Sequence, residues 1–212
     1  MLFTAVPPSA NPSSKLNRDL LQSLTGRLHV ELHTIQKGRL CFSPTKQTQA
    51  YSKWPAAFAS SVHSIRWVVT EITNLTASDN VASIAAKMEQ QLASISKQDI
   101  LQLYNSFGNV IMDHEAITTP LVFDLSCRRW ACSVMSKTSI STVQLSHELR
   151  RVVAQRYQWA PHYRNLHKGN IDLEFQVVLH DNACLLELLL SCPAKAPSAQ
   201  NRKVSFLQAK LT

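Results

Sequence analysis

The chain has 212 residues, is 45% hydrophobic and carries a formal net charge of +8. This apolar content is enough to bury one sizeable core or two small ones, and no apolar run reaches the length that spans a membrane. Five cysteines, an odd number without a CxxC pair, argue against a disulfide framework or a zinc knuckle and favour a reducing compartment, the cytoplasm or the nucleus.

The first third of the chain alternates strand and helix patterns. Residues 2–6 have the pattern of a strand, and residues 13–24 that of a helix with leucines at helical spacing. The stretches "LHVELHTI" and "GRLCFS" alternate apolar and polar residues, which predicts a hairpin that turns near Gly38. A second helix is predicted over residues 48–61, with Tyr51, Trp54 and Phe58 inward, and "SIRWVVTEI" is predicted to form the next strand. This order of elements is the ferredoxin-like pattern.

Two helices are predicted after this strand. The polar stretch of residues 73–80 separates them from the first third and offers Ser78 or Asp79 as a helix cap. Apolar residues at helical spacing predict a helix over residues 81–95 and a shorter one that ends at Gly108. We interpret both apolar stripes as core faces and not as ligand sites.

The last third contains a strand, a helix and a hairpin. "LVFDLSCR" alternates as a strand, and residues 145–159 follow as a helix. The apolar stripe of this helix consists of Leu145, Leu149, Val152 and Val153. His147, Arg150 and Arg151 are predicted to point away from the stripe, while Arg156 lies at its end. "IDLEFQVVL" and "ACLLELLLS" predict a hairpin, and the apolar run of its second strand suggests burial on both faces.

Positive charge is concentrated in one segment. Residues 1–119 carry ten basic and eight acidic side chains, residues 120–170 carry eight and two, and residues 171–212 carry four of each. We predict that the eight basic residues of the middle segment bind the phosphates of a polyanion such as RNA. They are Arg128, Arg129, Lys137, Arg150, Arg151, Arg156, Arg164 and Lys168.

Aromatic residues accompany these charges. Trp130, Tyr157, Trp159 and Tyr163 are interleaved with the basic residues, as is common on surfaces that stack bases. The alternative is that Tyr157 and Trp159 complete the core and that each arginine is merely solvated. The sequence pattern leaves this alternative open.

Most enzyme motifs are missing from the sequence. The four glycines are far apart, so no glycine-rich loop can approach a nucleotide cofactor, and neither a GxSxG elbow nor an HExxH pair occurs. His180 and Cys184 are four residues apart but have no second ligand pair nearby. Cys127 is better interpreted as a buried strand cysteine than as a nucleophile. The sequence therefore predicts neither catalytic residues nor a metal site.

The segment of residues 121–190 resembles the THUMP domain of RNA-modifying enzymes, in particular the THUMP-domain guanine methyltransferases. The resemblance rests on "VFDLSCRR", on the helix "TVQLSHELRRVVAQRYQW" and on "YRNLHKGNIDLEFQVVLHDNACLLELLLS". The matching positions are Phe123, Ser126, Cys127, Arg128, Trp159, Asn165, Leu173, Glu174 and His180. The earlier "GRLCFS" and "VHSIRWVV" are similar to the ferredoxin-like domain that accompanies THUMP.

The resemblance implies an α/β (α+β) fold in which a ferredoxin-like domain, residues 1–73, precedes a THUMP domain, residues 78–192. Residues 193–212 are expected to form a disordered tail. The implied function is binding of a structured RNA, a tRNA or a small nuclear RNA, together with its single-stranded 3′ end. In the family, a following domain methylates guanine N2 with S-adenosylmethionine, often with a zinc-ribbon activator subunit as partner.

The sequence departs from the family after Ser191. It offers no glycine-rich cofactor loop and no Asn/Asp-Pro-Pro-aromatic motif, so this chain is expected to bind no cofactor itself. We therefore expect the RNA-binding part of a guanine methyltransferase-like protein without its catalytic domain, which leaves a short isoform, a fragment or a free-standing binding subunit as possibilities. Two alternatives remain open: a protein-interaction or regulatory subunit that does not touch RNA, and a truncated S-adenosylmethionine-dependent RNA methyltransferase.

Overall fold

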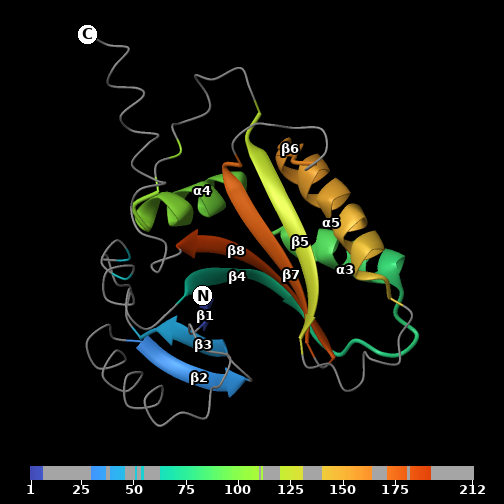
Figure 1. Cartoon of the computed structure of the whole chain (residues 1–212), viewed down its shortest axis with the longest axis horizontal. Helices are drawn as coiled ribbons and strands as arrows, with labels where there is room; N and C mark the ends of the chain where they lie inside the picture. The colour runs from blue at the N-terminus through green and yellow to red at the C-terminus, as the bar shows by residue number, and fades with distance from the viewer. Residues whose placement is uncertain are drawn as a thin grey trace. The chain divides into compact units, whose positions relative to one another are not determined.

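The structure is a computed structural model that describes residues 1–6, 30–36, 39–45, 51, 54, 63–109, 111, 120–130, 140–163, 171–180 and 182–191. The strands in this part of the chain are β1 (Leu2–Val6), β2 (Val30–Gln36), β3 (Arg39–Pro44), β4 (Ser64–Ile72), β5 (Val122–Trp130), β6 (Ala160–Pro161), β7 (Leu173–His180) and β8 (Ala183–Ser191). The helices are α3 (Val81–Leu92), α4 (Lys97–Ser106) and α5 (Thr142–Tyr157). The described strands form a mixed sheet in the order β2-β3-β1-β4-β8-β7-β5-β6 (Figure 1). The predicted mixed α/β fold is confirmed.

Two compact units divide the chain. The first consists of Met1–Thr4 and Arg66–Leu190, and the second of Ala5–Ile65 and Ser191–Thr212. The first unit contains α3, α4 and α5 together with β5 to β8. The division of the sequence into a domain of residues 1–73 and another of residues 78–192 stays a prediction about which segments fold on their own.

The second unit contains the predicted hairpin. β2 and β3 pair antiparallel from Val30 opposite Pro44 to Gln36 opposite Arg39, which confirms it. Phe42 of β3 is buried, and its ring centroid lies 5.5 Å from that of Trp54. The predicted inward position of Trp54 is confirmed, since it is 2% exposed. The helix expected over residues 13–24, most of the helix expected over 48–61 and the expected tail lie outside the described residues.

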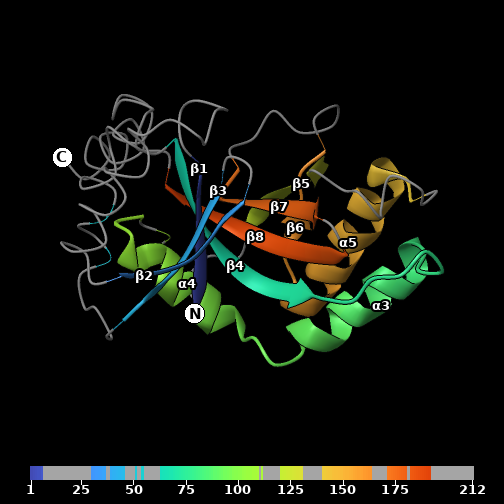
Figure 2. The same cartoon turned by 90° about the horizontal axis from the view of Figure 1, so that it is seen from below.

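The two faces of the sheet of the first unit carry different side chains. β5 pairs parallel with β7, which pairs antiparallel with β8. Because side chains alternate along a strand, Phe123, Leu125 and their partners on β7 share one face, and all of them are at most 1% exposed. Glu174 and Glu187 lie on the opposite face. Figure 2 shows the described helices on one side of the sheet, so the apolar face and the helices enclose the core.

α3 and α4 follow the predicted stripes. Ile84, Met88 and Leu92 of α3 are fully buried. The predicted cap is wrong by one or two residues, because the Asn80 side chain accepts a hydrogen bond from the Ser83 backbone N–H at 2.9 Å. α4 ends before Gly108, whose φ of +82° suits glycine. Among the described helices, none combines the length and the apolar character needed to cross a membrane.

α5 buries the predicted stripe. Leu145, Leu149, Val152 and Val153 are at most 2% exposed. The Ser141 side chain caps the first turn, and the helix ends at Gln158 in the left-handed conformation. The chain then forms β6, a two-residue strand that the sequence pattern does not reveal. Tyr157 and Trp159 are buried and stack at 4.7 Å, so they belong to the core.

Candidate nucleic-acid interface

The first half of α5 lies beside an open edge of the sheet. β6 pairs only with Val122 and Phe123, so the rest of the outer edge of β5 has no strand partner in the described chain. The Ser146 hydroxyl donates a hydrogen bond to the Leu125 carbonyl of this edge at 3.1 Å. This hydrogen bond satisfies a carbonyl that a neighbouring strand would otherwise bind, and it holds α5 along β5.

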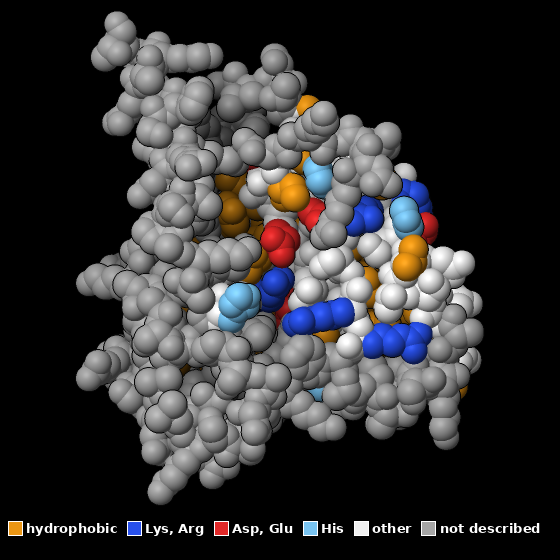
Figure 3. Space-filling model, in the orientation of Figure 1, with side chains coloured by type: hydrophobic (Ala, Val, Ile, Leu, Met, Phe, Trp, Pro, Cys, Tyr) orange, Lys and Arg blue, Asp and Glu red, His pale blue; other side chains and the backbone are white. Residues whose placement is uncertain are grey.

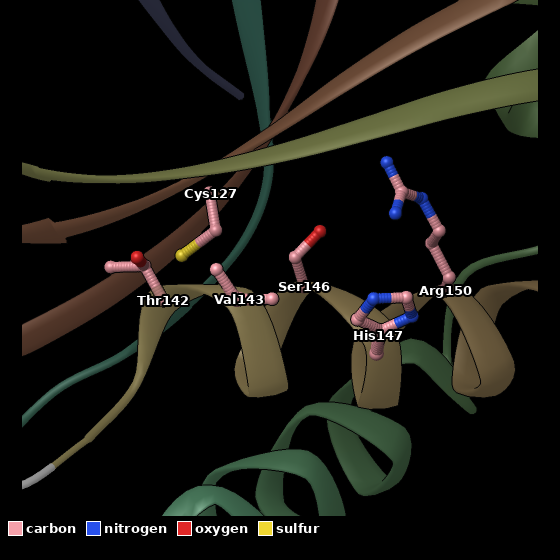
Figure 4. A pocket seen from close by; sticks show the side chains of 6 residues that line it. All are labelled: Cys127, Thr142, Val143, Ser146, His147 and Arg150. Atoms are coloured by element: carbon pink, nitrogen blue, oxygen red, sulfur yellow. The ribbon is translucent and has the colours of Figure 1, made fainter. Parts of the chain in front are cut away.

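A hollow of about 240 Å³ lies between β5 and α5. Its lining residues are Cys127, Thr142, Val143, Ser146, His147 and Arg150. Figure 4 shows that the Cys127 thiol points from the strand toward the start of α5, near Thr142 and Val143, and that Arg150 extends from α5 toward β5. The hollow therefore combines neutral hydrogen-bonding groups with a cation, a mixture that suits an anionic or polar ligand.

Arg150 is turned toward the sheet edge. Its Nη2 donates to Asp124 Oδ1 at 3.0 Å, and the exposed fractions of the two side chains are only 16% and 11%. The expectation that Arg150 points away from the core side of the helix is wrong. Because α5 packs at the edge of the sheet, Arg150 still reaches the carboxylate of Asp124, although it lies beside the apolar stripe and not in it.

The other arginines near the hollow make different contacts. Arg129 donates to the carbonyl of Ile140, just before α5. Arg151, one residue after Arg150, is exposed and pairs with Glu148 of the same helix at 2.5 Å. This ion pair raises the pKa of Arg151 and lowers that of Glu148, mainly through their side-chain hydrogen bond. Arg128 is half-buried on β5.

Arg156, at the far end of α5, binds α3. Its Nε donates to the Leu92 carbonyl at 3.2 Å and its Nη2 to the Ala93 carbonyl at 2.7 Å. These are carbonyls at the C-terminal end of α3, where a positive charge also interacts favourably with the helix dipole. The contacts shown for Arg156 are therefore structural.

The described basic residues of this segment come from two elements. Figure 3 shows several separate Lys and Arg side chains on the face that it displays, with Asp and Glu side chains near some of them. Lys137, Arg164 and Lys168 lie outside the described residues. Arg128 and Arg129 lie on β5, where alternation places their side chains on opposite faces, while Arg150 and Arg151 lie in the middle of α5 and Arg156 in its last turn.

The thiol in the hollow is not activated. Burial raises the pKa of Cys127 to about 12, so the thiol is protonated at neutral pH and is a poor nucleophile. Burial raises the pKa of Cys184 even further. The described residues contain no group of three or more His, Cys, Asp or Glu that could hold a metal ion.

Solved structures share this fold. TrmN from Thermus thermophilus aligns with 90% of the chain at a TM-score of 0.57 and 11% sequence identity. A predicted N6-adenine-specific DNA methylase from Listeria monocytogenes aligns with 89% of it at 0.52 and 12% identity. A 4-thiouridine synthetase, solved in complex with RNA and with bound ATP, aligns with 88% at 0.52 and 10% identity. At these identities the likeness shows the fold alone.

The alignments also show how the chain lengths differ. The chain spans 45% of TrmN, 40% of the Listeria protein and 40% of the synthetase. No protein-family model matches the sequence, and no curated protein matches it. The fold is thus shared with part of larger proteins.

Proposed function

We propose that this protein binds RNA through the surface formed by β5 and α5, as a THUMP-type module. The observation that carries the proposal is the hollow between these two elements, which Arg150 lines, with Arg128 and Arg129 on the same strand and Arg151 on the same helix. The likeness in fold to a synthetase solved with RNA supports it. Lys137, Arg164 and Lys168 belong to the same proposed phosphate-binding set, and Arg156 contributes mainly to the fold.

Phosphate binding gives the proposal a physical signature. Each phosphate that a basic residue neutralises releases counterions, so RNA affinity falls as salt rises. For about five phosphate contacts on a single strand, the slope of log affinity against log salt is on the order of −3.5. We expect this slope in fluorescence anisotropy titrations with a labelled RNA hairpin that has a single-stranded 3′ end. A flat salt dependence would contradict the proposal.

A matched pair of variants locates the surface. Arg128→Ala/Arg129→Ala and Lys87→Ala/Lys97→Ala each remove two positive charges, the first pair on β5 and the second on α3 and α4. We expect the first double variant to reduce RNA affinity about tenfold and the second to reduce it less than about twofold. Equal losses would mean that net charge alone, and no particular surface, attracts the RNA.

The finer proposal is that the chain is the RNA-gripping part of a guanine-N2 RNA methyltransferase-like protein. It is supported by the likeness in fold to a protein described as a predicted N6-adenine-specific DNA methylase. Purified chain with labelled S-adenosylmethionine and total RNA should show no methyl transfer. Measurable turnover would instead support the truncated-methyltransferase alternative.

The natural RNA and a protein partner are part of this finer proposal. Crosslinking in cells and sequencing of the bound RNA would distinguish a tRNA from a small nuclear RNA, and the latter would place the protein in the nucleus. A zinc-ribbon activator subunit is the protein partner that the resemblance suggests. Co-purification with such a subunit would support it, and recovery of the chain alone would not.

A further inference from the structure

Arg150 is held from two sides. Its Nη2 donates to Asp124 Oδ1 at 3.0 Å, and its Cζ lies 5.8 Å from the centre of the Tyr163 ring. Its Nε is buried and has no hydrogen-bond partner among the described residues. A long, mobile side chain is thus confined to one orientation at the hollow.

The carboxylate that holds Arg150 is itself fixed. Asp124 is 8% exposed, and its Oδ1 also accepts a hydrogen bond from the Leu125 backbone N–H at 2.8 Å. A rigid strand therefore determines where the carboxylate lies, and the carboxylate determines where the guanidinium lies. Fixing an arginine before binding removes the rotamer entropy that a free arginine would lose on contact with a ligand.

The neighbouring ion pair provides a contrast. Glu148 and Arg151 pair on the solvent side of the same helix, and their side chains are 35% and 54% exposed. Such a surface pair contributes little and restrains the arginine weakly. Two adjacent arginines on α5 are thus each paired with one carboxylate, but only Arg150 is fixed at the hollow.

We propose that Asp124 is a positioning residue, which orients Arg150 so that the part of its guanidinium that lines the hollow binds an RNA phosphate there. This inference rests on the proposed RNA binding. It predicts that removal of Asp124 weakens RNA binding, which is the opposite of what net charge alone would predict. A carboxylate near a phosphate repels it, so the removal of Asp124 should tighten RNA binding if net charge alone matters.

The test compares Asp124→Ala with Glu148→Ala, using the labelled RNA hairpin at fixed salt. Each variant removes one carboxylate that is paired with an arginine of α5. We expect Asp124→Ala to bind the hairpin about three- to tenfold more weakly, and Glu148→Ala to bind as tightly as the unaltered protein or up to about twofold more tightly. Binding by Asp124→Ala that equals or exceeds that of the unaltered protein overturns the proposal.

Two further variants separate positioning from folding. Asp124→Asn keeps the oxygen that accepts from Leu125 and Arg150, so its affinity should fall between those of the unaltered protein and Asp124→Ala, while the matched Glu148→Gln shows no loss. Should Asp124→Ala not fold, an Asp124→Asn affinity at or above that of the unaltered protein overturns the proposal by itself. In an Arg150→Ala background, the Asp124→Ala change should cause no further loss of affinity. An additional loss would show that Asp124 does not act through Arg150.

The same data separate this proposal from the proposed function. Salt-dependent binding by the unaltered protein, with no effect of the Asp124 variants, refutes the positioning role and leaves RNA binding in place. No binding of the hairpin or of total RNA by the unaltered protein refutes both.

Discussion

The middle and the last turn of α5 present similar residues in different settings. In the middle of the helix, Arg150 lies at a hollow beside an open strand edge, paired with Asp124. At its last turn, Arg156 donates to the terminal carbonyls of α3, and the Tyr157 hydroxyl donates to the Ile95 carbonyl at 3.4 Å. The first arginine is paired with a strand carboxylate at an open hollow, and the second joins two helices. An arginine therefore acquires its role from the acceptors that the fold brings to it.

The largest expected effect on stability is at the hollow. Arg150→Ala leaves the Asp124 carboxylate buried without its cation, which should lower the free energy of unfolding by about 3 kcal/mol. The double variant Arg150→Ala/Asp124→Ala removes both charges and should be more stable than Arg150→Ala. Urea unfolding at pH 7 measures both. If the single and double variants are equally stable, the ion pair is weaker than its burial suggests.

A smaller effect on stability is expected in the last turn of α5. Arg156→Ala removes two hydrogen bonds to α3 carbonyls and a favourable charge at the C-terminus of α3, which together should contribute about 1 kcal/mol. Thermal unfolding should show a decrease in Tm of roughly 3 °C. Its RNA affinity should fall less than that of Arg150→Ala, measured on the same hairpin. If Arg156→Ala lost more RNA affinity than Arg150→Ala, the binding role given to Arg150 and the structural role given to Arg156 would be wrong.

The smallest expected effect at neutral pH concerns Tyr157. Tyr157→Phe loses one long hydrogen bond and should cost under about 1 kcal/mol at pH 7. Burial raises the pKa of Tyr157 from 10 to about 12 in the folded protein. The unfolded tyrosine therefore loses its proton first, and its stabilising contribution is full below pH 10 and is lost as pH rises toward 12.

Urea unfolding at pH 7 and at about pH 11 tests this pH dependence, since the unfolded tyrosine is largely ionised at the higher pH. The stability difference between the unaltered protein and Tyr157→Phe should narrow or change sign at high pH. Other groups titrate equally in both proteins, so the comparison isolates Tyr157. If the difference in unfolding free energy between the two proteins stayed constant with pH, the Tyr157 ring would be more accessible to water than the structure indicates.

The sequence predicts the elements well wherever apolar periodicity is strong. The bounds of β4 match the predicted strand, and the buried stripe of α5 consists of the four residues that the helical spacing selects. The stripe of α5 follows because one face of the helix must leave water, whereas β4 is buried on both faces except at Glu71. The short strand β6 carries no such signal, because two residues that complete a parallel pairing show no periodicity.

The candidate site could be located from the sequence only in part. Charge counts point to the segment around β5 and α5, but they cannot distinguish Arg150 from Arg151 or Arg156. That distinction depends on where α5 lies relative to the edge of β5 and the end of α3, which is a tertiary property. Asp124 carries no sequence signal of its own, because its role follows from the arginine that packs against it.

The central claim is that RNA binds at the surface of β5 and α5. Ultraviolet crosslinking of the purified chain to the RNA hairpin, followed by mass spectrometry of the linked peptides, tests it most directly. The account predicts crosslinked peptides within residues 122–163. Crosslinks confined to other parts of the chain, with none in this segment, would contradict it.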